Sequence, residues 1–204
     1  MHRLLFSNLF GTLAVFGQFQ HVKLGVKGGG YFTDFYNARN SRTSSGQYTV
    51  GPSVEVFLRK DISIEANALF RPYSTAGGFG IFANNITEVM EKGNSLEVPI
   101  LFKKYFGNGP VRPFAGIGPN IRRLFNREST FTCYGCGQGV EVRDGKPKGS
   151  TTLGGTVAAG IELPKFGPRW TLEFRYSLYQ VKYTSLAGGK EDQHQAGVFL
   201  GITF

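Results

Sequence analysis

An all-β fold, an eight-stranded antiparallel up-and-down transmembrane β-barrel, is predicted for this 204-residue chain by three observations. First, segments of strand length alternate apolar with small or polar residues, and successive side chains of a strand point to opposite faces. Second, short and long connections alternate between these segments. Third, the mean hydropathy is only −0.15. No run approaches the roughly 20 apolar residues of a membrane helix, whereas barrel strands expose only alternate side chains to lipid.

The N-terminal segment, residues 1–20, is interpreted as a secretory signal peptide, which leaves residues 21–204 as the barrel domain. A short positive start at residues 1–3 precedes a largely apolar stretch at residues 4–16, as in exported proteins. No A-x-A pattern marks a cleavage site. The alternative is a short N-terminal helix that the mature protein retains.

Eight strands are expected at about residues 22–32, 47–58, 61–71, 95–105, 111–124, 150–163, 169–182 and 194–204. Tight turns rich in Gly, Pro, Asn or charged residues join them at residues 59–61, 107–110 and 164–168. The longer connections, rich in Ser, Thr, Asn and Gly, lie at residues 33–46, 72–94, 125–149 and 183–193. Barrels with short periplasmic turns and long outer loops alternate in this way. The long connections are therefore expected to be extracellular.

The two faces of these strands separate apolar from charged residues. In the third strand, Ile64 and Ala66 alternate with Glu65 and Asn67. The charges on the polar faces form a predicted lumen network of Lys23, Lys27, Glu55, Glu65, Glu97, Lys103, Arg112, Arg122, Glu162, Glu173 and Arg175. Acids and bases nearly balance, as a lumen just wide enough for side chains requires. The alternative is the solvated polar face of a soluble sheet, where charges need no balance.

The last strand alternates apolar residues with small ones and ends on an aromatic residue. Its apolar face consists of Ala196, Val198, Leu200, Ile202 and Phe204. An apolar strand with a terminal Phe resembles the closing strand of bacterial outer-membrane barrels. Val198, Leu200, Ile202 and Phe204 then resemble the signal read by the barrel-assembly machinery, which is an expected partner during biogenesis. An ordinary core strand at the end of the chain is the alternative.

The central strands carry a more specific pattern. Residues 95–106, SLEVPILFKKYF, are followed by a Gly/Asn turn and by residues 111–120, VRPFAGIGPN. They resemble the outer-membrane β-barrel domain family often labelled "porin family", which shows a Leu-Glu-(Ile/Val)-Pro strand, a turn and a Pro-(Tyr/Phe)-x-Gly-x-Gly strand. With Phe204 the resemblance extends from about residue 22 to the end. It implies an integral protein of the cell outer membrane, of the small eight-stranded type, and it brings no catalytic motif.

Cys133 and Cys136 are the only cysteines of the chain and lie in the third long connection. A C-x-x-C redox motif usually opens a helix in a βαβ unit, and a zinc site needs four ligands. Outside the reducing cytosol, a local disulfide is the favoured interpretation. Free thiols, or a metal or redox role, remain alternatives.

No catalytic, cofactor-binding or metal site is expected. His194 with Ser177 or Ser185 would suggest a hydrolase pair, although a His among several Ser is more often polar surface. The sequence pI of about 9.7 raises nucleic acid as a partner, but the basic residues are scattered over rims and turns. Phosphates of outer-membrane lipid and lipopolysaccharide are therefore the expected partners, and nucleic acid is not.

Together these patterns predict a small, monomeric outer-membrane barrel with a plugged polar lumen. Its expected role is structural or interactive at the cell surface, without catalysis and with a surface partner that the sequence does not identify. The alternatives are a passive small-solute pore, a lipid-modifying outer-membrane enzyme and a soluble lipocalin-like carrier. The interior charges, together with Phe57, Phe114 and Phe199, argue against an open lumen.

Overall fold

The computed structural model describes residues 22–36, 47–82, 85–134, 140–144, 150–164, 168–182 and 190–204. The expected signal peptide, Cys136 and Ser185 lie outside these residues. In the described part of the chain, no helix is long and apolar enough to cross a membrane.

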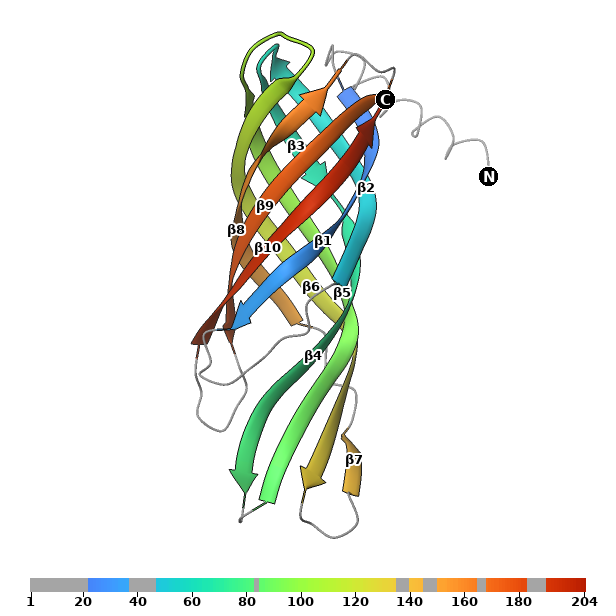
Figure 1. Cartoon of the computed structure of the whole chain (residues 1–204), viewed down its shortest axis with the longest axis vertical. Coiled ribbons are helices and arrows are strands. Elements are labelled where there is room, and N and C mark those ends of the chain that lie inside the picture. Colours follow the sequence, from blue (N-terminus) through green and yellow to red (C-terminus); the bar gives the residue numbers. More distant parts are fainter. Residues whose placement is uncertain are drawn as a thin grey trace, which may run out of the picture.

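The described residues form ten strands: β1 (Val22–Tyr36), β2 (Gln47–Arg59), β3 (Ile62–Asn67), β4 (Leu69–Phe82), β5 (Asn85–Tyr105), β6 (Arg112–Tyr134), β7 (Val140–Asp144), β8 (Ser150–Leu163), β9 (Arg169–Lys182) and β10 (Lys190–Thr203). All pair antiparallel, and β1 pairs with both β2 and β10, so the sheet closes on itself (Figure 1). β3 and β4 each pair with β2 and with β5, so they are two parts of one barrel strand. β7 pairs with β6 alone and is not part of the closed ring, so eight barrel strands remain and the predicted eight-stranded barrel is confirmed.

The interruption between β3 and β4 lies at Ala68, where the chain passes very close to Gly51 of β2. Ala68 donates its backbone N–H to the carbonyl of Pro52 at 3.0 Å. A Cβ on Gly51 would lie 1.8 Å from the Ala68 carbonyl oxygen. Only a residue without a side chain permits this approach of two backbones.

Replacing Gly51 with Ala should lower the free energy of unfolding by about 1–3 kcal/mol, because the added methyl group forces the two backbones apart. Gly155→Ala is the matched control, since a Cβ at Gly155 would meet nothing within 4 Å. Urea-induced unfolding in detergent micelles measures both variants. Equal stability of the two would contradict the close approach.

One end of the barrel carries the short connections and is called the turn end. There β2 ends at Arg59 and β3 begins at Ile62, β5 ends at Tyr105 and β6 begins at Arg112, and β8 ends at Leu163 and β9 begins at Arg169. These bounds agree with the three tight turns expected from the sequence. β1 begins and β10 ends at this same end (Figure 1).

The opposite end, called the hairpin end, extends well beyond the barrel rim. β2 begins only at Gln47 and β8 only at Ser150, yet β4 and β5 remain paired as far as Phe82 and Asn85. β5 also pairs with β6 as far as Tyr134, and β7 adds a further strand beside β6. These segments form an extension sheet that projects past the other strands (Figure 1).

The expectation that residues 72–94 and 125–149 are loops is thus wrong for most of their length. Their Ser, Thr, Asn and Gly content suggested loops, but each segment has an antiparallel partner that satisfies its backbone groups. The connections expected at 33–46 and 183–193 are also shorter, since β1 continues to Tyr36 and β10 begins at Lys190.

The barrel is apolar outside and polar inside. Aliphatic side chains such as Val54, Ile117 and Leu172 are exposed on the outer face. Exposed aromatic residues lie toward both ends of this face, including Trp170 at the turn end and Tyr48 at the hairpin end. Most of the buried residues are polar or charged. A soluble protein has the reverse arrangement, whereas a barrel in lipid turns its apolar face outward.

Candidate functional site

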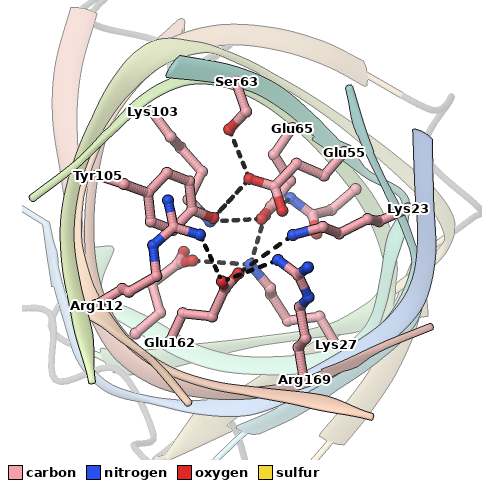
Figure 2. A network of polar contacts seen from close by, with 12 residues as sticks. Lys23, Lys27, Glu55, Ser63, Glu65, Lys103, Tyr105, Arg112, Glu162 and Arg169 are labelled. Atoms are coloured by element: carbon pink, nitrogen blue, oxygen red, sulfur yellow. Dashed lines mark hydrogen bonds and ion pairs between the residues drawn. The ribbon is translucent and has the colours of Figure 1, made fainter. Parts of the chain in front are cut away.

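The lumen of the barrel brings together the charged residues that the sequence assigned to the polar faces. Ten of the eleven predicted network residues are buried, and Arg112 is half-buried. They come from β1, β2, β3, β5, β6, β8 and β9. Figure 2 looks into the barrel and shows several of these side chains, among them Lys27, Glu65 and Glu162, pointing toward one another. They form three clusters along the lumen.

The central cluster contains the three bases Lys27, Lys103 and Arg175 and the three acids Glu55, Glu65 and Glu173. Lys27 donates hydrogen bonds to Glu65 and, at 2.8 Å, to Glu173. Lys103 Nζ lies 2.8 Å from Glu65 Oε2 and 3.8 Å from Glu55 Oε1. Arg175 Nε donates to Glu173 Oε1 at 2.8 Å. The cluster is electrically balanced, as burial of charges requires.

Neutral side chains complete the coordination of these carboxylates. Ser63 and Tyr105 each donate a hydroxyl hydrogen bond of 2.6 Å to Glu55, and Asn67 donates an amide bond of 2.8 Å to Glu65. Glu55 and Glu65 thus have neutral partners beyond their ion pairs, whereas Glu173 is bound by Lys27 and Arg175. Hydrogen bonds to every buried carboxylate separate a stable buried network from a costly one.

The turn-end cluster is centred on Glu162. Arg112 Nη1 and Arg169 Nη1 donate to Glu162 Oε1 at 3.2 and 3.3 Å, and Lys23 Nζ lies 3.6 Å from Glu162 Oε2. Figure 2 shows these side chains converging on the carboxylate from different strands. One acid therefore faces three bases at this level of the lumen.

The hairpin-side cluster joins charges to neutral donors and aromatic rings. Tyr31 donates its hydroxyl to Glu97 Oε2, and Arg71 Nε lies 3.9 Å from Glu97 Oε1. Arg122 donates to the amide oxygen of Gln193. Glu97 and Arg122 were both predicted to face the lumen, and the structure pairs each of them with a different partner.

Aromatic rings fill the space between the clusters. Lys103 Nζ lies 3.9 Å above the ring of Phe114, the Arg122 guanidinium carbon 4.1 Å above Tyr179, and that of Arg175 4.5 Å above Phe199. Stacking of cations on ring faces stabilises both groups in a desolvated space. Tyr105, Tyr179, Phe199 and Arg175 are among the largest fully buried side chains.

Sequence reasoning missed several lumen residues. Tyr31 and Gln193 were left out because they lie at the ends of expected strands. Alternation did place Arg71 on the polar face, where it continues the inward series of Glu65 and Asn67, but Arg71 was not included in the predicted charge network. The neutral partners Ser63, Tyr105 and Tyr179 carry no charge and gave no signal of their own.

Outside the lumen, a turn at the turn end holds a separate ion pair. Lys104 donates a hydrogen bond to the Asp61 carboxylate, and both side chains are 44% exposed. This hydrogen bond holds the pKa of the Asp61 carboxyl below its ordinary value.

The other residues singled out from the sequence do not form a second site. His194 Nδ1 contacts the Tyr176 hydroxyl at 2.5 Å on the outer face, whereas Ser177 is buried in the lumen beside Thr156. The two members of that suggested hydrolase pair therefore lie on opposite faces. Cys133 is part of β6 rather than a loop. The disulfide expected between Cys133 and Cys136 stays a prediction, because Cys136 lies outside the described residues.

The predicted assembly residues of β10 lie on the outer face. Val198 and Leu200 are exposed, Ile202 is half-buried and Phe204 is 79% exposed. The Phe204 N–H donates to the Leu24 carbonyl of β1 at 2.8 Å, so the last residue still joins the two closing strands. In the described part of the chain, no group of three or more His, Cys, Asp or Glu residues could hold a metal ion.

Comparison with known proteins places this geometry in context. Residues 16–178 match the family model described as "outer membrane protein beta-barrel domain". Similar solved structures include OprG from Pseudomonas aeruginosa, with 11% identity over 90% of this chain and 94% of that chain and a TM-score of 0.49. Ail from Yersinia pestis, solved with the heparin analogue sucrose octasulfate, shows 9% identity over 90% and 99%, with a TM-score of 0.45. Neisserial surface protein A shows 10% over 90% and 96%, with a TM-score of 0.39. No curated protein matches significantly.

Proposed function

Since the chain belongs to the outer membrane protein β-barrel domain family, and is thus a small integral outer-membrane barrel, we propose that it acts as a plugged anchor. In this proposal the barrel holds the extension sheet at the cell surface for a structural or interactive role. It neither conducts solutes nor catalyses a reaction. The single observation that carries the proposal is the filled, hydrogen-bonded lumen.

The central cluster supports the closed state of the lumen. Lys27 of β1 is bonded to Glu65 of β3 and to Glu173 of β9, so one side chain bridges widely separated strands. Lys103 and Arg175, the other two bases of the central cluster, are fully buried. Opening a path for ions would break several charge-assisted hydrogen bonds at once, each stronger than a neutral one.

The strand count and the connections support the proposed orientation. An even number of strands places the two termini of the barrel domain on the same side of the membrane, and in this architecture short turns face the periplasm while longer elements face outward. The turn end then faces the periplasm and the extension sheet faces the medium, together with the connections about 33–46 and 183–193. This orientation makes the extension sheet the surface available to a partner.

Export and assembly complete the proposal. Residues 1–20 would direct secretion, and the outer face of β10 up to Phe204 would be read by the barrel-assembly machinery. The apolar band would contact lipid, with lipopolysaccharide on the outer leaflet, and the barrel would remain a monomer. The alternative proposal of a passive pore makes the opposite prediction for ion flow.

In planar bilayers, the purified protein should give no unitary current steps, because the central cluster closes the lumen. A general porin inserted under the same conditions is the positive control for conductance. Heat-modifiable gel mobility of the same sample is the control for folding. Discrete steps from folded protein would favour the pore and contradict the plugged anchor.

A further inference from the structure

The turn end of the lumen opens into a pocket of about 290 Å³. This volume is close to the lower limit of roughly 300–1,000 Å³ for small-molecule sites. Its lining includes Lys23, Phe57, Lys60, Asn108, Arg112 and Arg169. The cations come from β1, β6, β9 and the β2–β3 turn, so they belong to separate segments that the closed barrel brings together.

The charges of this pocket are not balanced. Lys23, Lys60, Arg112 and Arg169 supply four positive charges, while Glu162 is the carboxylate that three of them contact. The pocket therefore has an excess of three positive charges. The central cluster has three acids for three bases, so the excess is a local property of the turn end.

Two buried donors that line the pocket have unused hydrogen-bonding capacity. Lys23 is only 8% exposed, and its Nζ donates no hydrogen bond to the described residues. It rests instead 3.9 Å above the Phe57 ring, beside Glu162 at 3.6 Å. Arg112 Nε likewise has no acceptor among these residues. Buried donors without acceptors are costly, and a bound acceptor removes this cost.

The geometry also orients the two guanidinium groups. Arg112 donates through Nη2 to the Lys60 carbonyl at 2.9 Å and through Nη1 to Glu162. Arg169 of β9, which flanks β8 on the side away from β6, reaches the same carboxylate oxygen, and 38% of its side chain is exposed. Planar guanidinium groups recognise carboxylates and phosphates through paired N–H donors.

We propose that this pocket binds a phosphate-type oxyanion that enters from the turn end. Phosphate fits better than a carboxylate because it offers more acceptor oxygens and up to two negative charges against an excess of three positive charges. Lys23 would contact the anion at the floor, Arg112 and Arg169 at the walls and Lys60 at the mouth. The proposal is independent of the plugged-anchor function, because the pocket lies outside the central cluster.

Calorimetric titration with inorganic phosphate, at constant ionic strength and in a maltoside detergent without phosphate, tests the site. Arg169→Gln and Lys60→Gln should each weaken binding by about tenfold through the loss of a charge-assisted contact. Arg59→Gln is the matched control, because Arg59 is exposed in the same turn and does not line the pocket. Heat-modifiable mobility should be the same for all variants.

Glu162→Gln provides a gain of function. It removes the carboxylate charge that pairs with Arg112, Arg169 and Lys23 and competes with phosphate for them. Phosphate binding should therefore tighten by about tenfold. A misfolded variant would not give this result. Unchanged or weaker binding by folded Glu162→Gln, or equal binding by Arg59→Gln and Arg169→Gln, would overturn the proposal.

A second experiment distinguishes free phosphate from a lipid headgroup as the source of the bound phosphate group. Native mass spectrometry of the same protein, with phosphatidylglycerol or uncharged diacylglycerol added, reports lipid retention. Retention of phosphatidylglycerol that Arg169→Gln loses and Arg59→Gln keeps would support the site with a headgroup as its source. Failure of both inorganic phosphate and phosphatidylglycerol to bind would overturn it.

Discussion

Glu65→Gln should lower the free energy of unfolding by about 3–5 kcal/mol, the cost of removing one partner from a buried ion pair. The substitution keeps the shape of the side chain but removes its charge. Lys27 and Lys103, which both bond to Glu65, would then share the remaining acids of the central cluster. Urea-induced unfolding in lipid vesicles, followed by Trp170 fluorescence, measures the change.

The matched control is Asp61→Asn, which neutralises the carboxylate of an exposed ion pair with Lys104 at the turn end. Solvent screens that pair, so its loss should leave the unfolding curve almost unchanged. Combining Glu65→Gln with Lys27→Gln should recover part of the loss, since the double change removes the unpaired base as well. Equal effects of Glu65→Gln and Asp61→Asn would contradict a desolvated lumen network.

Val54→Arg should cost roughly 2–4 kcal/mol, the penalty for an arginine near the midplane on the lipid face of a barrel. Val54 lies in the middle of β2, pairs with Leu24 and Ala66, and is exposed on the outer face. Leu172→Arg, on the outer face of β9, should behave similarly.

Val111→Arg is the control for depth. Val111 is 47% exposed just before β6 begins at the turn end. There an arginine side chain reaches the interface, and the cost should fall to about 0–1 kcal/mol. The same unfolding measurement compares the three variants. Tolerance of arginine at Val54 and Leu172 equal to that at Val111 would contradict the assignment of the lipid face.

Much of this architecture could be predicted because alternation is a local property. The inward positions of Glu65, Glu97 and Arg175 follow from the side-chain period of two, whatever the tilt of the strands. Tight turns are local as well, and those around residues 60 and 108 were placed correctly. The charges of the lumen were identified for the same reason.

The partners of those charges could not be predicted, because they depend on the stagger between strands. Glu162 lies beside Arg112 in the β6–β8 ladder, but its contact with Lys23 crosses the lumen and requires the closed barrel. The extension sheet was missed for a different reason. Polar and glycine-rich strands lack the apolar alternation that marks a lipid-facing segment, and their pairing appears only when neighbouring hairpins align.

The seam between β1 and β10 has a consequence for the order of assembly. Lys27 stands on β1, yet its acceptor Glu173 stands on β9, 146 residues later in the chain. Contacts between such distant segments form late, because the loop between them must close first. Until β1 meets β10, some charges of the central cluster lack the oppositely charged partners that lie on distant strands. Such charges cannot leave water without a penalty of several kcal/mol per ion. Strands entering the bilayer one at a time would each expose such charges to hydrocarbon. Insertion is therefore expected to follow or accompany closure of the barrel. The hydrogen bond from Lys27 to Glu173 would then make the pairing of β1 with β10 hard to reverse.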